Sequence, residues 1–119
     1  MSYDLAVWEG ERPADDAAAG QCFTDLYGKY IDTDGPDVDP TKQIAAYVAE
    51  LLEQWPDLTE DEDGISPWSP GPLIGEASGP LIYFPMRWSI AQEASAYAAG
   101  VASSMGLNCY APQARCLRS

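Results

Sequence analysis

Acidic side chains are the residues of this chain whose number and spacing could support chemistry. Seventeen of its nineteen Asp and Glu residues lie in the first 63 positions, together with three basic residues, whereas residues 64–119 hold two acids and three bases. Carboxylates at such density can bind cations or a basic protein, and two of them can act as general acid and base. The sequence therefore allows three kinds of site: a cation site, a catalytic pair and a docking surface for a basic partner.

Two acidic stretches, 32–34 and 61–64, resemble part of a calcium-binding loop. An EF-hand loop needs Gly at its sixth position and Glu at its twelfth. Placing Asp63-Gly64 on positions five and six of that loop puts Thr59 first and Pro70 last, so the match fails at both ends. Loose binding of divalent ions by either loop stays chemically reasonable, but the pattern favours a solvated acidic surface. We expect no metal site and no cofactor.

Catalysis lacks its usual residues in this chain. There is no His, which removes the common general base and the Ser-His and Cys-His pairs. A carboxylate pair would need a cleft that holds two carboxyl groups about 5–9 Å apart and raises the pKa of one of them. No Gly-rich phosphate loop follows the first predicted strand, and the local negative charge repels nucleic acid. We therefore expect a protein that is not an enzyme and does not bind nucleic acid directly.

Three cysteines, Cys22, Cys109 and Cys116, are odd in number and widely spaced. This spacing favours reduced thiols over a disulfide framework, although a bridge between Cys109 and Cys116 stays open. Cys22 falls on a predicted helical stripe and Cys109 in a predicted strand. We therefore expect both to be small core residues rather than reactive thiols.

Trp68 lies among prolines and serines directly after the second acidic loop. Its ring can fold back as a lid on the core or stay exposed as an anchor for a partner, and the sequence leaves both open. The loops 32–39 and 57–63 are expected to present carboxylates to an Arg- and Lys-rich protein. The predicted partner-binding residues are Asp32, Asp34, Asp37, Asp39, Asp57, Glu60, Asp61, Glu62, Asp63 and Trp68.

Apolar periodicity predicts three elements in the first half of the chain. Residues 3–9 alternate as a strand does, and an apolar stripe within 14–31 recurs every three or four residues as in a helix. After a loop at 32–39, Asp39 is predicted to cap a second helix over 40–55. Both helices precede any further strand.

The second half of the chain predicts a hairpin, a helix and a closing strand. Short apolar runs at 73–76 and 81–84 predict the hairpin. Ser89 begins a capping box for a helix that ends at Gly106. The strands expected after this helix are 107–110 and, as an optional addition, 114–117.

This order of elements predicts a single α+β domain over residues 1–119. The expected fold is a ferredoxin-like βααββαβ sandwich, an antiparallel sheet with its helices on one face. An irregular α/β sheet with another strand order is the rival. A chain of 119 residues is long enough for one self-sufficient core.

No targeting or membrane-spanning segment is evident in the sequence. The first 16 residues contain five acids and no apolar stretch typical of a secretory signal. No segment approaches the roughly 20 apolar residues that cross a bilayer. We expect a soluble, cytoplasmic protein of unknown oligomeric state.

Three segments carry a resemblance to other proteins: Tyr3-Asp-Leu-Ala-Val-Trp-Glu9, Ser66-Pro-Trp-Ser69 and Gly106-Leu-Asn-Cys-Tyr-Ala-Pro-Gln113. The chain resembles small acidic cytoplasmic proteins, some of which look like immunity proteins encoded beside secreted polymorphic toxins. The last segment resembles one that ends in Tyr-Asp-Pro-Gln, but this chain has Ala111 in place of the Asp. The resemblance implies a protein that covers the active site of a toxin, and it assigns no functional residue.

The leading hypothesis is a non-enzymatic immunity or inhibitor protein that neutralises a basic toxin or enzyme through its acidic surface. An alternative is a small enzyme or ligand-binding domain with a pocket between sheet and helices. A third is a regulatory or assembly subunit that works as a homo-oligomer. The acidity alone is also explained by a need for solubility, although solubility does not require the acids to cluster.

Overall fold

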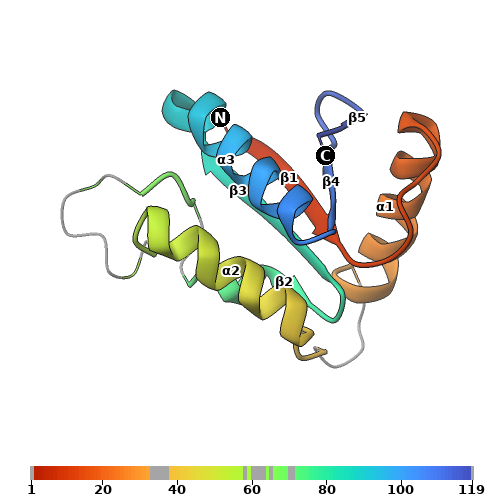
Figure 1. The fold of residues 1–119 in the computed structure, drawn as a ribbon, viewed down its shortest axis with the longest axis horizontal. Coiled ribbons are helices and arrows are strands. Elements are labelled where there is room, and N and C mark those ends of the chain that lie inside the picture. Colours follow the sequence, from red (N-terminus) through yellow and green to blue (C-terminus); the bar gives the residue numbers. More distant parts are fainter. Residues whose placement is uncertain are drawn as a thin grey trace.

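The computed structural model describes residues 2–32, 38–57, 59, 64, 66–69 and 72–118. They form a five-stranded antiparallel sheet, in the order β2-β3-β1-β4-β5, with three α-helices packed on it (Figure 1). The elements are β1 Ser2–Trp8, α1 Asp16–Tyr30, α2 Lys42–Gln54, β2 Ala77–Ser78, β3 Leu81–Arg87, α3 Ala91–Ser104, β4 Asn108–Ala111 and β5 Cys116–Leu117. The expected α+β class and antiparallel sheet are confirmed.

The central strand β1 is apolar on both of its faces. Leu5 and Val7 point to one side of the sheet, Ala6 and Trp8 to the other, and all four side chains are buried. Both faces of the sheet therefore have to be covered for burial to be complete. Helices lie on both faces, so the expected sandwich with helices on one face is wrong, and β5 extends the sheet beyond its four strands.

Helices α2 and α3 cover the first face and lie side by side, roughly along the direction of β1 and β3 (Figure 1). The stripe of α2 buries Ile44, Tyr47 and Leu51 in the main core. The hydroxyl of Tyr47 donates to the carbonyl oxygen of Ala98 at 3.0 Å. Ala94 and Ala98 of α3 are fully buried, and such small side chains let this helix approach its neighbours closely.

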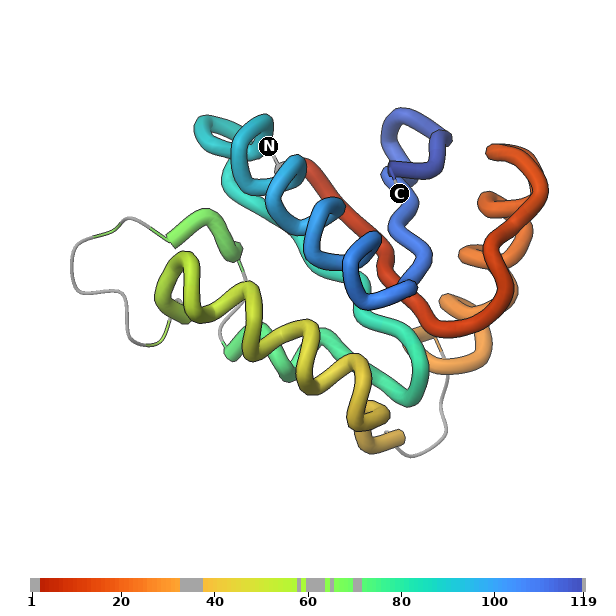
Figure 2. The backbone as a smooth tube through the Cα atoms, in the orientation of Figure 1, coloured from red at the N-terminus to blue at the C-terminus, as the bar shows by residue number. Residues whose placement is uncertain are grey.

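Helix α1 covers the second face of the sheet. Ala19 is buried there, and Phe23 and Leu26 pack against a cluster that contains Ala6, Trp8 and Tyr110. Figure 2 shows the chain leaving β1 for α1 and then reaching α2, which lies on the opposite face. Cys22 is exposed, so its predicted core position is wrong.

The entry to α2 differs from the prediction. Thr41 caps this helix, since its hydroxyl oxygen accepts from the backbone N–H of Ile44 at 3.3 Å. Asp39, the predicted cap, lies two residues earlier and is exposed. Asp and Thr are both favoured N-cap residues, so propensity alone could not predict which of the two caps α2. The exposed Asp39 carboxylate is consequently left at the surface.

The predicted hairpin is shifted along the chain. Residues Leu73–Glu76 form a 3-10 helix, and the strand that pairs with β3 is the short β2. Strand β3 continues through Pro85, past the end of the predicted run 81–84. Proline is tolerated because β2 pairs only with the start of β3, and the segment around Trp68 lies along the rest of that edge through a bridge to Met86.

The third helix begins without the predicted capping box. A 3-10 turn over Trp88–Ile90 leads into α3, and no side chain caps its first turn. Its end is as expected, since Gly106 adopts a positive φ of 73° directly after the helix.

The end of the chain forms β5, which confirms the optional strand. The backbone N–H of Leu117 donates to Oδ1 of Asp16 at 3.0 Å, which ties this edge strand to the start of α1. Cys109 is buried in the core and Cys116 is half-buried, and both are free thiols. No helix among the described residues is long and apolar enough to span a membrane.

Candidate functional site

Asp57, predicted to lie on the partner-binding surface, is a structural residue. Its side chain is 8% exposed. Oδ2 accepts from the backbone N–H of Leu73 at 3.1 Å, and Oδ1 accepts from the N–H of Thr59 at 3.4 Å. The carboxylate fastens the segment after α2 to the 3-10 helix that precedes β2, so a partner cannot contact it in this conformation. The prediction for Asp57 is wrong because backbone donors, not water, satisfy its charge.

Trp68 is the lid of the core and not an exposed anchor. Its side chain is 0% exposed, and its Nε1–H donates to the carbonyl oxygen of Trp55 at 3.4 Å. Its ring makes edge-to-face contacts with Trp55 and Phe84, with centroids 5.8 and 5.9 Å apart. This removes Trp68 from the predicted partner-binding surface. The burial follows from the pairing of its backbone beside Met86, which turns the indole inward.

The remaining predicted residues divide into two groups. Asp32 and Asp39 are exposed on the described part of the chain. The others lie outside the described residues: Asp34, Asp37, Glu60, Asp61, Glu62 and Asp63. Of the predicted surface, the structure therefore places only the two ends of the first acidic loop in solvent.

One of these ends borders a hollow of about 280 Å³ between the end of α1 and β2. We call it the acidic hollow, because Asp39 and Glu76 contribute carboxylates to its wall. Val38, 47% exposed, adds an apolar rim. The residues that line it are Tyr30, Ile31, Val38, Asp39, Pro40, Gly75, Glu76, Ala77 and Ser78. Sequence reasoning identified Asp39 but missed Glu76, which is the last residue of the segment 73–76 that was expected to be a strand.

Ser78 is the unusual residue of the acidic hollow. Ala77 packs against the core under α2 and α3, so the next side chain along β2 points to the α1 side of the sheet. The Ser78 hydroxyl is buried and has no hydrogen-bond partner among the described residues. A buried hydroxyl without a partner is uncommon in folded proteins. It can accept from, or donate to, a polar group that enters the hollow.

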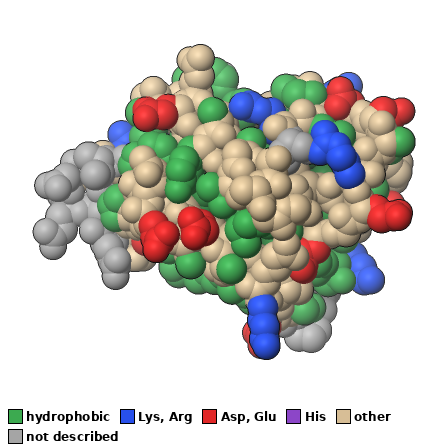
Figure 3. Space-filling view, viewed as in Figure 1, with side chains coloured by type: hydrophobic (Ala, Val, Ile, Leu, Met, Phe, Trp, Pro, Cys, Tyr) green, Lys and Arg blue, Asp and Glu red, His purple; other side chains and the backbone are tan. Residues whose placement is uncertain are grey.

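Exposed carboxylates elsewhere on the described surface have no cationic partner. Glu50, Glu53 and Asp25 are exposed, and none of the three forms an ion pair with a described Lys or Arg. Figure 3 shows red side chains scattered over one face of the molecule, some of them over α2. The negative field therefore acts outward rather than being neutralised within the protein.

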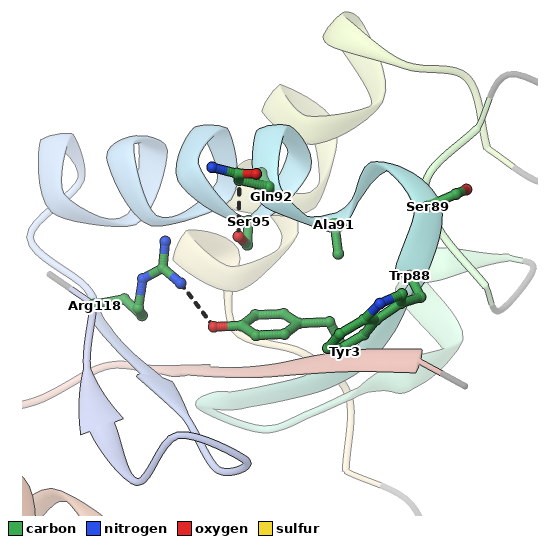
Figure 4. A pocket seen from close by; sticks show the side chains of 7 residues that line it. All are labelled: Tyr3, Trp88, Ser89, Ala91, Gln92, Ser95 and Arg118. Atoms are coloured by element: carbon green, nitrogen blue, oxygen red, sulfur yellow. Dashed lines mark hydrogen bonds between the residues drawn. The ribbon is translucent and has the colours of Figure 1, made fainter.

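A second and larger hollow lies at the opposite end of the sheet, between β1, the start of α3 and the residue after β5. It has a volume of about 360 Å³ and we call it the Arg118 groove (Figure 4). Figure 4 shows Arg118 at one end and Trp88 at the other, with the Tyr3 ring between them. The lining residues are Tyr3, Trp88, Ser89, Ala91, Gln92, Ser95 and Arg118.

Two hydrogen bonds hold Arg118 in place, one from its side chain and one from its backbone. Its Nη1 donates to the hydroxyl oxygen of Tyr3 at 2.7 Å, and its backbone N–H donates to the carbonyl oxygen of Cys109 at 2.7 Å. The guanidinium also lies 6.0 Å from the centroid of the Tyr3 ring. Tyr3 and Arg118 are 115 positions apart in the sequence, so no spacing rule could have brought them together.

The other end of the Arg118 groove is aromatic. Trp88 is 55% exposed, and its ring centroid lies 6.2 Å from that of Tyr3. On the wall formed by α3, the Ser95 hydroxyl donates to the carbonyl oxygen of Gln92 at 3.3 Å. The groove thus has a cationic end, a polar wall and an apolar end.

The two hollows are of opposite charge, and their chemistry is what bears on function. Comparisons with protein families, curated proteins and solved structures find no match to this chain. Within the described ranges, no group of three or more His, Cys, Asp or Glu side chains is placed to hold a metal ion. The carboxylates of one hollow and the guanidinium of the other are suited to bind charged groups.

Three groups, the buried Cys109 and Tyr47 and the half-buried Tyr83, have shifted pKa values, and none of them lines either hollow. Burial raises the pKa of the Cys109 thiol to about 12. Burial also raises the pKa of Tyr47, and burial followed by the Asp4 hydrogen bond and charge raises that of Tyr83. Each shift keeps the group protonated at neutral pH, so these three groups supply neither a thiolate nor a phenolate base.

Proposed function

We propose that this protein is a non-enzymatic binding protein that neutralises a basic partner through its acidic surface, as an immunity or inhibitor protein does. The observation that supports this is the set of exposed carboxylates without ion-pair partners on the described surface. The net charge of −13 at pH 7 adds a long-range attraction for any cationic protein. Such a field raises the association rate and discriminates against acidic partners.

The acidic hollow is the contact region proposed for this partner. Asp39 and Glu76 can receive a Lys or Arg side chain, and the exposed Val38 adds apolar contact beside them. Asp57 and Trp68 belong to the core and have no role in this contact. The proposal thus places the interface at the α1 and β2 end of the molecule.

The chemistry of the partner follows from the same charge. Proteins that handle nucleic acids or nucleotides commonly carry basic surfaces, because these bind phosphate. A toxin of that kind is therefore the partner class proposed here, and inhibition requires both proteins in the same compartment, which we propose to be the cytoplasm. Covering the toxin's active site would block its substrate without any reaction by the inhibitor.

The proposal is tested by co-expression with the product of the neighbouring reading frame, followed by affinity measurement at low and physiological salt. We expect a complex whose affinity falls at least about tenfold as salt rises from about 50 to 300 mM. The double variant Asp39→Asn/Glu76→Gln should weaken binding more than Glu50→Gln/Glu53→Gln, which removes the same charge from α2. Equal effects of the two variants would reject the acidic hollow as the contact. A complex insensitive to salt, or no complex, would reject the electrostatic proposal itself.

A further inference from the structure

We propose that the Arg118 groove is a binding site for a small organic monoanion, a carboxylate with a planar ring beside it. This site is at the other end of the sheet from the acidic hollow and does not depend on the basic partner. Both a free aromatic acid and the C-terminal aromatic residue of a peptide carry a carboxylate with a planar ring beside it. The argument rests on the two ends of the groove and on its charge.

The cationic end is pre-organised for a carboxylate. Arg118 is half-buried, and its bonds to Tyr3 and Cys109 fix both the guanidinium and its backbone before any ligand arrives. Only Nη1 is used in the bond to Tyr3, so the other N–H donors of the guanidinium can meet a ligand. Their planar fork matches the two oxygens of a carboxylate, and a donor held in place loses little entropy on binding.

The apolar end suits a ring. Trp88 exposes more than half of its surface in a chain whose other aromatic rings are mostly packed, and its ring lies beside that of Tyr3, so that the two rings together line this end of the groove. A ring entering here can pack on the indole and on the Tyr3 ring, while Ala91 leaves space because its side chain is a single methyl group. The groove volume of about 360 Å³ is within the range of small-molecule sites.

The charge balance selects a monoanion. Arg118 is the one charged residue among those that line the groove in the described part of the chain. One guanidinium neutralises one negative charge, whereas the protein's net charge of −13 disfavours a dianion such as a phosphate monoester. The first turn of α3, which no side chain caps, forms one wall and directs the positive end of its dipole toward this region (Figure 4).

The test uses the whole protein and three probes: phenylacetate, its neutral analogue phenylacetamide, and a short peptide that ends in Phe with a free carboxylate. Binding is followed by chemical-shift changes in the labelled protein, including the indole N–H of Trp88, assigned by its loss in Trp88→Ala. We expect saturable binding of phenylacetate or of the peptide below about 10 mM, and at least about tenfold weaker binding of the amide. Saturation by phenylacetate alone identifies a free acid as the ligand, and saturation by the peptide alone identifies a chain terminus.

Two variants and a matched control locate the site. Arg118→Gln should weaken binding of the carboxylate at least about tenfold, whereas Arg115→Gln, the same charge change in the turn before β5, should not. Trp88→Ala, at an exposed position, should reduce affinity for the ring-bearing acid without changing the melting temperature. The proposal is overturned if no probe saturates, if the amide binds as tightly as the acid, or if Trp88→Ala and Arg118→Gln both leave the affinity unchanged.

Discussion

The backbone N–H of Leu73 donates to the carboxylate of Asp57 at 3.1 Å, which joins the segment after α2 to the segment that leads into β2. Asp57 begins the most acidic stretch of the sequence, yet the fold buries its side chain. A carboxylate that accepts two backbone N–H bonds replaces the hydration it loses. Acidity in a sequence is therefore a poor guide to which carboxylates stay in water.

Replacing Asp57 should destabilise the protein strongly. Asp57→Ala removes the acceptor for two backbone donors, one of them the buried N–H of Leu73, and we expect a loss of about 2–3 kcal/mol in the free energy of unfolding. Glu53→Ala, an exposed acid on α2, is the control and should change it by less than about 0.5 kcal/mol. Urea unfolding measures both. Equal stability of the two variants would show that the Asp57 bonds contribute nothing net.

The two tryptophans at opposite extremes of exposure should respond differently to truncation. Trp68→Ala leaves a cavity beside Trp55 and Phe84, and we expect it to lower the free energy of unfolding by about 3–5 kcal/mol. Trp88→Ala should change it by less than about 0.5 kcal/mol because the indole is largely in solvent. If Trp68→Ala does not fold, the milder variant Trp68→Phe should still lose more stability than Trp88→Ala. If neither Trp68→Phe nor Trp68→Ala lowered the free energy of unfolding, the conclusion that Trp68 is packed in the core would be wrong.

Gly79 should be intolerant of a side chain because of Tyr30. It adopts a positive φ of 57°, and a Cβ there would lie 2.9 Å from Cε1 of Tyr30. Gly106 is the matched control, with a φ of 73° and no atom within 4 Å of the same Cβ. We expect Gly79→Ala to be about 1–2 kcal/mol more destabilising than Gly106→Ala, in which only the backbone strain operates. The excess should shrink in a Tyr30→Ala background, as thermal unfolding would reveal.

Alkaline pH should destabilise the protein partly through Tyr83. The hydroxyl of Tyr83 donates to Oδ2 of Asp4 at 2.6 Å, and burial together with that carboxylate raises the tyrosine's pKa above its ordinary value of 10.0. The folded state keeps the proton to higher pH than the unfolded state. Its contribution is thus complete below pH 10 and declines as pH rises toward the raised pKa.

The variant Tyr83→Phe removes this titration. Urea unfolding at about pH 8 and about pH 11 should show a smaller loss of stability with pH in the variant than in the natural protein. The variant itself should be less stable at pH 8, because the bond to Asp4 is lost. An identical decline in both proteins would mean that Tyr83 titrates alike in the folded and unfolded states.

Elements with strong local signals were predicted well. The alternation of residues 3–9 predicted β1, and the apolar stripe of 40–55 predicted α2, because each pattern repeats with the period of the backbone that carries it. Gly106 marked the end of α3 for a similarly local reason, its freedom to adopt a positive φ. The prediction failed where two nearby residues could serve equally well, as Asp39 and Thr41 could as the N-cap of α2.

The candidate sites could be predicted only in part. Asp39 was found because it lies in an acidic loop, but the burial of the Ser78 hydroxyl depends on which face of β2 this residue occupies, and the place of Glu76 depends on the 3-10 helix that precedes β2. The Arg118 groove was missed entirely, since Tyr3 comes from the first strand, Trp88 from the turn before α3 and Arg118 from the residue after β5. No local pattern records a meeting of three separate segments.

The sequence by itself determined the class of the fold, most of its helices and strands, and the excess of negative charge in the first half. These are properties of short windows, set by periodicity, by breaker residues and by composition. Only the tertiary structure decided that α1 covers the second face of the sheet, that Asp57 and Trp68 are buried, and that Arg118 reaches Tyr3. Those outcomes depend on how strands distant in sequence pair and on which apolar faces remain to be covered, and burial then assigns each polar side chain to water or to a backbone partner.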